Sequence, residues 1–239
     1  MRIHFIVHES YEGPGYFTEW AGLHDYQVSF TRVYLNEALP CEVDAFDLLV
    51  ILGGPQNPHT RQEECVYFDS LGEQAFIKQA IVRNKAVVGV CLGAQLIGEA
   101  LGSTYQVSPY QEIGYFPIAL TESGNVDPKL AEFDLAEVVG HWHNDMPGLT
   151  SDSRVLAVSE GCPRQIVRYS PLVYGLQCHL EFISEQLAPL ITHDQPAFNT
   201  KSRGKYVQDP SVIIKHDTTR MNLLLAGFMD KLVQAYRDY

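Results

Sequence analysis

The sequence predicts an α/β protein with a doubly wound, mostly parallel sheet flanked by helices and an added antiparallel or mixed strand region. Three observations support this. The first hundred residues alternate short apolar runs with helical patterns. Several of these runs are continuously apolar, which is typical of parallel strands covered on both faces. After residue 112, short strand-like runs follow one another closely. The 239 residues, 46% hydrophobic and 19% charged, predict a single globular domain over 1–239.

The first half supplies the parallel part of the predicted sheet. Strands are expected at residues 3–7, 27–34, 46–52 and 86–90, and helices at 16–23, 68–83 and 92–101. The packing face of the second helix is expected to consist of Leu71, Ala75, Phe76, Ile77 and Ala80. Ligands bind beyond the carboxyl ends of such strands, where Gly53-Gly54-Pro55 and Cys91 fall.

The second half predicts the antiparallel or mixed extension and the closing helix. Strands are expected at residues 113–120, 137–141, 155–159, 165–169 and 173–178. A helix is expected over 181–191, and residues 194–209, which include Lys201, Arg203 and Lys205, are expected to form a loop or insertion. A closing helix is expected over 218–236. Its core stripe is Met221, Leu224, Leu225, Phe228 and Leu232.

Charge and segment lengths exclude several classes of protein. There are 17 basic and 29 acidic residues, a net charge of −12, which argues against binding to nucleic acid or to an anionic membrane. The longest apolar runs, 48–52 and 86–90, fall far short of the roughly 20 residues of a membrane-spanning helix. The first ten residues do not resemble a signal peptide. Five cysteines, an odd number, favour reduced thiols and a cytoplasmic location.

The pentapeptide Gly89-Val90-Cys91-Leu92-Gly93 is the most informative motif. It has the G-x-C-x-G form between a predicted strand and a predicted helix, the thiol counterpart of the nucleophile elbow. So sharp a turn needs small residues on both sides of the nucleophile, and the start of a helix favours the reactive thiolate. Cys91 is therefore the predicted nucleophile. The other cysteines, Cys41, Cys65, Cys162 and Cys178, are expected to be buried and inert.

A cysteine nucleophile needs a base, an orienting acceptor and donors for an oxyanion. His179 and Glu181 end a strand-like run at a spacing of two, which places both side chains on the same side of an extended chain. Glu181 could then hold the tautomer of the imidazole. The backbone N–H groups of Leu92 and Gly54 are the candidate oxyanion donors.

Together these motifs resemble the class I (triad) glutamine amidotransferases, above all the glutaminase domain of GMP synthase and its stand-alone relatives. The resemblance covers about residues 45–185 and implies a flavodoxin-like sheet. It implies that Cys91 attacks the side-chain amide of L-glutamine and forms a γ-glutamyl thioester. His179 would transfer the proton to the departing ammonia, and Glu181 would orient His179.

The resemblance also implies substrate contacts. Gln95 would help to hold the substrate, and residues 139–145 match a family loop that grips the amino-acid end of glutamine, with Trp142 and His143 as the carried-over residues. No cysteine or carboxylate cluster supports a metal at His141 and His143 in the sequence, so no metal is expected. No cofactor is expected either.

The ammonia acceptor is not encoded in the chain. It contains no synthetase domain and no phosphate loop of the G-x-x-x-x-G-K form, so a separate synthetase that works in trans is the expected partner. Two alternatives stay open. A γ-glutamyl peptidase acting on glutathione-like compounds would use the same triad in a more open cleft. The second alternative is a non-catalytic or partner-activated regulatory subunit, which would retain the fold without being an active enzyme by itself.

Overall fold

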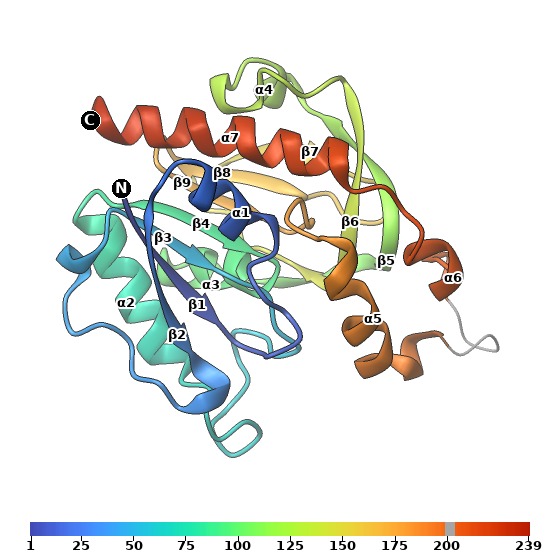
Figure 1. Cartoon of the computed structure of the whole chain (residues 1–239), viewed down its shortest axis with the longest axis horizontal. Helices are drawn as coiled ribbons and strands as arrows, with labels where there is room; N and C mark the ends of the chain where they lie inside the picture. The colour runs from blue at the N-terminus through green and yellow to red at the C-terminus, as the bar shows by residue number, and fades with distance from the viewer. Residues whose placement is uncertain (199–203) are drawn as a thin grey trace.

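The strands of residues 1–198 and 204–239, which the computed structural model describes, join one mixed sheet of ten strands (Figure 1). The order across the sheet is β10-β5-β7-β8-β9-β4-β3-β1-β2, and β6 pairs with β5 off this path. The strands are β1 (Arg2–Val7), β2 (Gln27–Arg32), β3 (Leu48–Ile51), β4 (Ala86–Val90), β5 (Gln106–Leu120), β6 (Ala136–Met146), β7 (Arg154–Val158), β8 (Ile166–Ser170), β9 (Val173–Leu176) and β10 (Tyr206–Val207).

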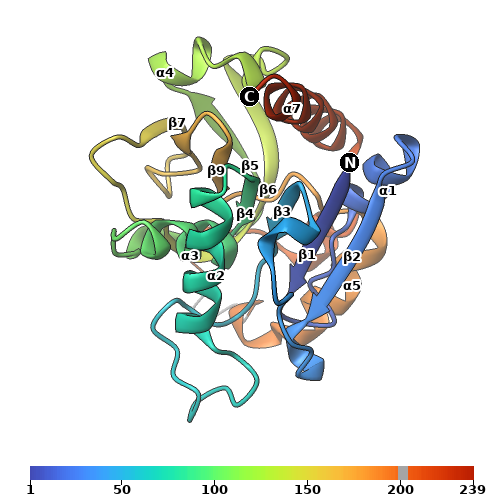
Figure 2. The same ribbon diagram turned by 90° about the vertical axis from the view of Figure 1, so that its left-hand side faces the viewer.

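The run β2-β1-β3-β4-β9 is parallel throughout and is doubly wound. Figure 2 shows α2 and α3 on one face of the sheet and α1 and α7 on the other. The helices are α1 (Tyr16–Leu23), α2 (Ser70–Val82), α3 (Leu92–Ala100), α4 (Glu122–Asn125), α5 (Ser184–His193), α6 (Pro210–Ile213) and α7 (Thr219–Arg237). Short 3₁₀ turns lie at Val33–Leu35, Val43–Ala45, Pro128–Leu130 and Gln195–Phe198. The predicted fold class is confirmed.

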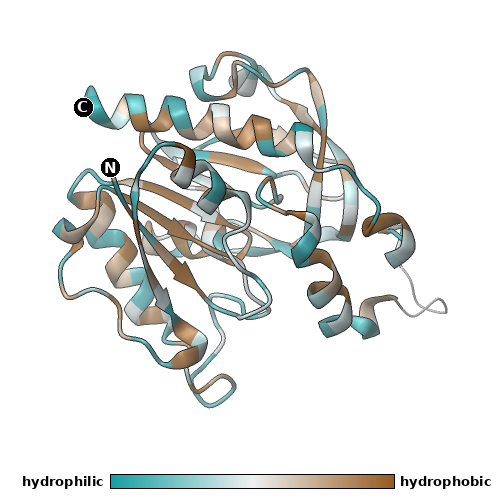
Figure 3. Ribbon diagram, in the orientation of Figure 1, coloured by the Kyte–Doolittle hydropathy of each residue, from teal (hydrophilic) through white to brown (hydrophobic). Residues whose placement is uncertain are grey.

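Strands β3 and β4 form the centre of the sheet and are buried along their whole length. Their continuous apolar runs appear brown in Figure 3. Such runs are expected in strands whose two faces are both covered by helices. Strand β2, at the edge, exposes its first three residues. Because β3 and β4 are parallel, their carboxyl ends lie at the same edge of this buried part of the sheet.

Strands β5, β6, β7 and β8 form the antiparallel extension that the sequence predicts. Strand β6 is longer than the predicted 137–141 and contains all of residues 139–145. The expectation that this segment is a loop is therefore wrong. Its backbone pairs with β5, with His143 opposite Glu112 and Asp145 opposite Val107, and the register shifts between these two pairs.

Helix α2 packs differently from its prediction. It begins at Ser70 after the N-cap Asp69, not at 68, and Leu71 and Ala75 face solvent. Phe76, Ile77 and Ala80 are buried as expected, but the other two buried residues of the helix are Ser70 and Glu73. The ion pair that Glu73 forms with buried His8, at 2.9 Å, accounts for this rotation of the helix.

Two expectations in the last third of the chain need correction. Helix α5 begins at Ser184 and not at 181, because His179 forms an antiparallel bridge with Gly140 and the backbone is still extended at Ile183. The stretch 194–209 is not all loop, since it contains the 3₁₀ turn Gln195–Phe198 and strand β10, which pairs in parallel with β5. Lys201 and Arg203 lie outside the described residues.

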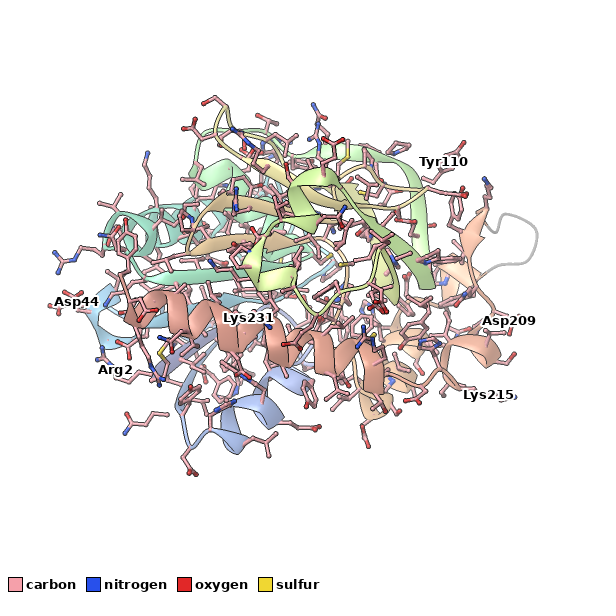
Figure 4. All side chains as sticks on the ribbon, turned by 90° about the horizontal axis from the view of Figure 1, so that it is seen from above. Arg2, Asp44, Tyr110, Asp209, Lys215 and Lys231 are labelled. Carbon is pink, nitrogen blue, oxygen red and sulfur yellow. The ribbon has the colours of Figure 1, made fainter. Side chains whose placement is uncertain are left out.

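Helix α7 buries the whole of its predicted stripe against the sheet. Figure 4 shows the charged side chains of Arg2, Asp44 and Lys231 at the surface around α7 and the neighbouring strands. In the described part of the chain, no helix combines the length and apolar character needed to cross a bilayer.

Candidate active site

Cys91 lies at the turn between β4 and α3, with φ 51° and ψ −109°. A positive φ at a residue other than glycine is strained, as in a nucleophile elbow. The flanking glycines permit the turn. A Cβ on Gly89 would collide with the backbone of Gly93, and a Cβ on Gly93 would collide with the carbonyl oxygen of Ile51. The sulfur of Cys91 lies 3.7 Å from the carbonyl oxygen of Trp142, to which the thiol donates.

His179 and Glu181 follow β9 and face the same side, as their spacing predicts. The Nδ1 atom of His179 lies 2.6 Å from Oε1 of Glu181. Two backbone hydrogen bonds to Gly140 hold His179, whose ring stacks on Phe182 with centroids 4.2 Å apart. Burial would lower the pKa of the imidazole, but Glu181 and Cys91 beside it raise the pKa to about 10.

The elbow and the His179–Glu181 pair meet around Gly53. A Cβ on Gly53 would lie 3.5 Å from Cβ of Cys91 and 3.6 Å from Cε1 of His179. Nε2 of His179 has no hydrogen-bond partner in the described residues, which leaves it available to the thiol and to a substrate. The predicted nucleophile, base and orienting carboxylate thus lie together, after β4 and after β9.

A pocket of about 330 Å³ opens beside Cys91. Its lining includes the predicted Gly54, Gln95, Trp142 and His143, and Leu92 is buried directly after Cys91. Gln95 donates to Oε1 of Gln177 at 3.1 Å, and the indole of Trp142 donates to Asp194 at 3.0 Å. Hydrogen bonds therefore hold both side chains in the lining of the pocket.

His143 borders the same pocket, and its imidazole contacts buried polar side chains. Its Nε2 atom lies 3.4 Å from a carboxylate oxygen of Glu112 and 3.4 Å from His141. The structure therefore places His143 in a buried polar cluster at the pocket wall. Glu112 lies 29 positions before His141 in the chain, so the sequence pattern did not connect them.

Three residues that shape the site, His8, Glu12 and Glu73, are absent from the sequence predictions. His8 lies 3.1 Å from the carbonyl oxygens of both Leu52 and Gly53, and its other nitrogen pairs with Glu73. His8 therefore holds the Gly53-Gly54 turn in place. Glu12 lines the pocket next to Gly53. Both His8 and Glu12 follow the carboxyl end of β1. Because ligand sites of such sheets lie beyond the carboxyl ends of the strands, this position could have identified them as candidates.

Glu12 is expected to reduce stability as the pH rises. Burial raises the pKa of this carboxyl to about 7; Glu9 and Glu181 add repulsion, while His179 and His8 oppose it. Between about pH 4.5 and 7 the unfolded chain loses this proton before the folded protein does. Glu12→Gln should therefore raise the free energy of unfolding by about 1–2 kcal/mol at pH 8, with the gain vanishing towards pH 4.5.

Urea unfolding at a series of pH values tests this expectation. Glu19→Gln, on the exposed face of α1, measures the effect of the same substitution at the surface. A gain from Glu12→Gln that is equal at pH 5 and pH 8 would contradict the assignment.

The other four cysteines are free thiols that differ in burial. Cys162 and Cys178 are buried as expected, and burial raises the pKa of the first to about 11 and that of the second well above its usual value. The expectation is wrong for Cys41, which is exposed, and for Cys65, which is half-buried. Both lie in surface turns between strands rather than in the sheet.

The fold and the elbow define an α/β protein with a cysteine at the carboxyl edge of a parallel sheet. The sequence profile of the family described as "Glutamine amidotransferase class-I" matches residues 21–195. The chain belongs to this family.

Two relatives show the degree of similarity. The chain is 49% identical over 236 residues to the glutamine amidotransferase-like protein YfeJ of Salmonella typhimurium, and the match covers 99% of each chain. It is 32% identical to a glutamine-hydrolysing GMP synthase subunit of Thermoplasma volcanium, over 68% of this chain and 76% of that protein.

Solved structures agree with this assignment. The crystal structure of SMU.1228c has a TM-score of 0.96 and 45% identity, and the match covers 98% of this chain and 100% of that one. A glutamine amidotransferase of Thermotoga maritima shares the fold with a TM-score of 0.85, at 20% identity and 98% coverage of both chains.

Proposed function

We propose that the protein hydrolyses the side-chain amide of L-glutamine to glutamate and ammonia through Cys91, His179 and Glu181. The observation that carries the proposal is the meeting of the strained cysteine with the hydrogen-bonded His179–Glu181 pair at one edge of the sheet. Membership of the class I family supports glutamine as the substrate.

In the proposed mechanism the sulfur of Cys91 attacks the amide carbon, and the C–N bond breaks as protonated His179 gives its proton to the departing ammonia. A γ-glutamyl thioester remains. Water then attacks the thioester carbon while His179 takes a proton from it, and the C–S bond breaks, which releases glutamate and returns the sulfur of Cys91 as the thiolate. The backbone N–H groups of Gly54 and Leu92 stabilise the oxyanion, and Glu181 holds the imidazole throughout.

The pocket suits an amino acid. Its lining contains side-chain amides, such as Gln95 and Asn144, and the carboxyl groups of Glu12, Asp145 and Asp194. Among the described residues, no lysine or arginine lines it. These acidic groups favour the α-ammonium of glutamine, and Gln95 and Trp142 bound the rest of the substrate. The ammonia acceptor belongs to a separate protein, in keeping with a relative that is one subunit of GMP synthase.

Release of ammonia and glutamate by the purified protein tests the proposal. Turnover of glutamine is expected to fall by about 10⁴-fold or more in Cys91→Ala, because the nucleophile is lost. Cys65→Ala, at a half-buried thiol outside the triad, is the control and should keep the activity. A reactive glutamine analogue should label Cys91 covalently.

Comparison with a γ-glutamyl peptide separates the alternatives. Turnover of the peptide alone would replace the glutaminase with a γ-glutamyl peptidase. Absence of turnover with covalent labelling of Cys91 would indicate a partner-activated subunit, and absence of both would overturn catalysis.

A further inference from the structure

Three buried side chains meet behind the wall of the pocket. Glu112 on β5 lies opposite His143 on β6, and His141 is two residues away on the same face of the ladder. Their exposed fractions are 1%, 6% and 0%. Oε2 of Glu112, Nδ1 of His141 and Nε2 of His143 form a nearly regular triangle with sides of 3.4, 3.4 and 3.5 Å.

The atoms of this triangle present lone pairs to one point. Nε2 of His141 lies 3.2 Å from the carbonyl oxygen of Phe116, which only accepts, so Nε2 carries the ring proton and Nδ1 is an acceptor. Within the described residues, the ion pairs of Glu112 are with these histidines only.

Gln165, which is fully buried, completes the cluster from the segment before β8. Its Nε2 atom lies 2.7 Å from Oε2 of Glu112, 3.2 Å from His141 and 3.3 Å from His143. It also lies 3.0 Å from the hydroxyl of Ser159, and two amide hydrogens cannot serve four such partners. Oε1 of Gln165 has no hydrogen-bond partner in the described part of the chain. Turning the amide by half a rotation would aim that oxygen into the cluster.

The four terminal atoms form a distorted tetrahedron. Tetrahedral zinc with bonds of about 2.0–2.1 Å holds its ligand atoms roughly 3.3–3.4 Å apart, which matches the triangle. The supporting contacts also match a metal site. The hydroxyl of Ser159 lies 2.8 Å from Oε1 of Glu112, and His141 donates its second ring nitrogen to a backbone carbonyl.

We propose that Glu112, His141, His143 and the side-chain oxygen of Gln165 bind one zinc ion in a closed structural site. The ion accepts the converging lone pairs, balances the charge of Glu112 and crosslinks β5 and β6 to the segment before β8. Trp142, whose carbonyl oxygen accepts from Cys91, lies between the two histidines, so the ion fixes the wall that faces the nucleophile. The proposal does not depend on the reaction that Cys91 performs.

Cobalt(II) is the probe, because tetrahedral Co²⁺ absorbs far more strongly in the visible range than the aqueous ion. The protein is stripped with a chelator and titrated with Co²⁺ alone, and then with Zn²⁺. We expect one equivalent of tetrahedral Co²⁺ per chain, displaced by one equivalent of Zn²⁺, and at least 100-fold weaker binding in His141→Ala. His59→Ala, at a surface histidine 3.2 Å from Glu99, is the matched control and should bind as the wild type does.

Gln165→Glu keeps the test decisive if His141→Ala fails to fold. Replacing the amide by a carboxylate adds a stronger zinc ligand, but without the ion it places two carboxylates side by side in the core. We expect Zn²⁺ to raise the Tm of Gln165→Glu by more than it raises that of the wild type. Absence of tetrahedral Co²⁺ in the wild type, an unchanged spectrum in His141→Ala, or a Tm of Gln165→Glu that Zn²⁺ does not raise would each overturn the site. The cluster would then be a hydrogen-bonded polar network only.

Discussion

Glu181→Gln is expected to lower kcat for glutamine hydrolysis by about 10³–10⁴-fold. Glu181 accepts from Nδ1 of His179 at 2.6 Å and thereby places the lone pair or acid proton of the imidazole at Nε2. A glutamine amide can donate to Nδ1 instead, which would put the ring proton on Nε2 of the neutral base and block proton abstraction. Steady-state glutamate release measures the effect, and Glu185→Gln, an exposed residue of α5, is the control.

The same variant should change stability in a pH-dependent way. The folded-state pKa of His179 is about 10, above its ordinary value of 6.5, so its charge stabilises the folded protein fully below pH 6.5. That contribution is lost as the pH rises through about 10. The wild type should therefore exceed Glu181→Gln in free energy of unfolding near pH 6, and the difference should shrink at higher pH. An unchanged kcat, or a difference that grows with pH, would refute this role for Glu181.

Gly93→Ala is expected to lower the free energy of unfolding by about 3 kcal/mol or more. The added Cβ would collide with the carbonyl oxygen of Ile51 in β3, which is backbone and cannot rotate away. Helix α3 would have to separate from the sheet, which would also displace Cys91. Urea unfolding and glutamate release on the same preparation measure both consequences.

Gly22→Ala in α1 is the matched control for this substitution. A Cβ on Gly22 meets nothing within 4 Å, and the residue is exposed. Alanine is the better helix former there, so the free energy of unfolding should rise by about 0.5 kcal/mol. If Gly93→Ala were as stable as Gly22→Ala, close packing of the elbow on β3 would not be the reason for glycine at position 93.

The sequence predicted the parts of the site that depend on neighbours in the chain. The elbow at Cys91 could be recognised because the strand, the turn glycines and the helix are contiguous. The pairing of His179 with Glu181 followed from the two-residue period of an extended chain. The buried strands were recognisable for the same reason, since a continuous apolar run needs cover on both faces.

Features made by distant segments could not be predicted in this way. Leu71 and Ala75 were expected to be buried, but the contact of Glu73 with His8, 65 positions away, orients α2 differently. A strand was expected at 137–141, and the family resemblance made 139–145 a loop, but pairing with the long strand β5 extends the strand to Met146. In both cases the local pattern was compatible with two structures, and a partner remote in sequence selected one of them.

Local geometry and the burial of contiguous runs were thus enough to predict the α/β class, the strained turn at Cys91 and the spacing of His179 and Glu181. The folded sheet was needed to show that Glu12 enters the pocket and that Glu112 and Gln165 meet His141 and His143. These contacts depend on the register of the strands. Which side chains face one another across strands is set by the packing of the whole sheet, and no short segment carries that information.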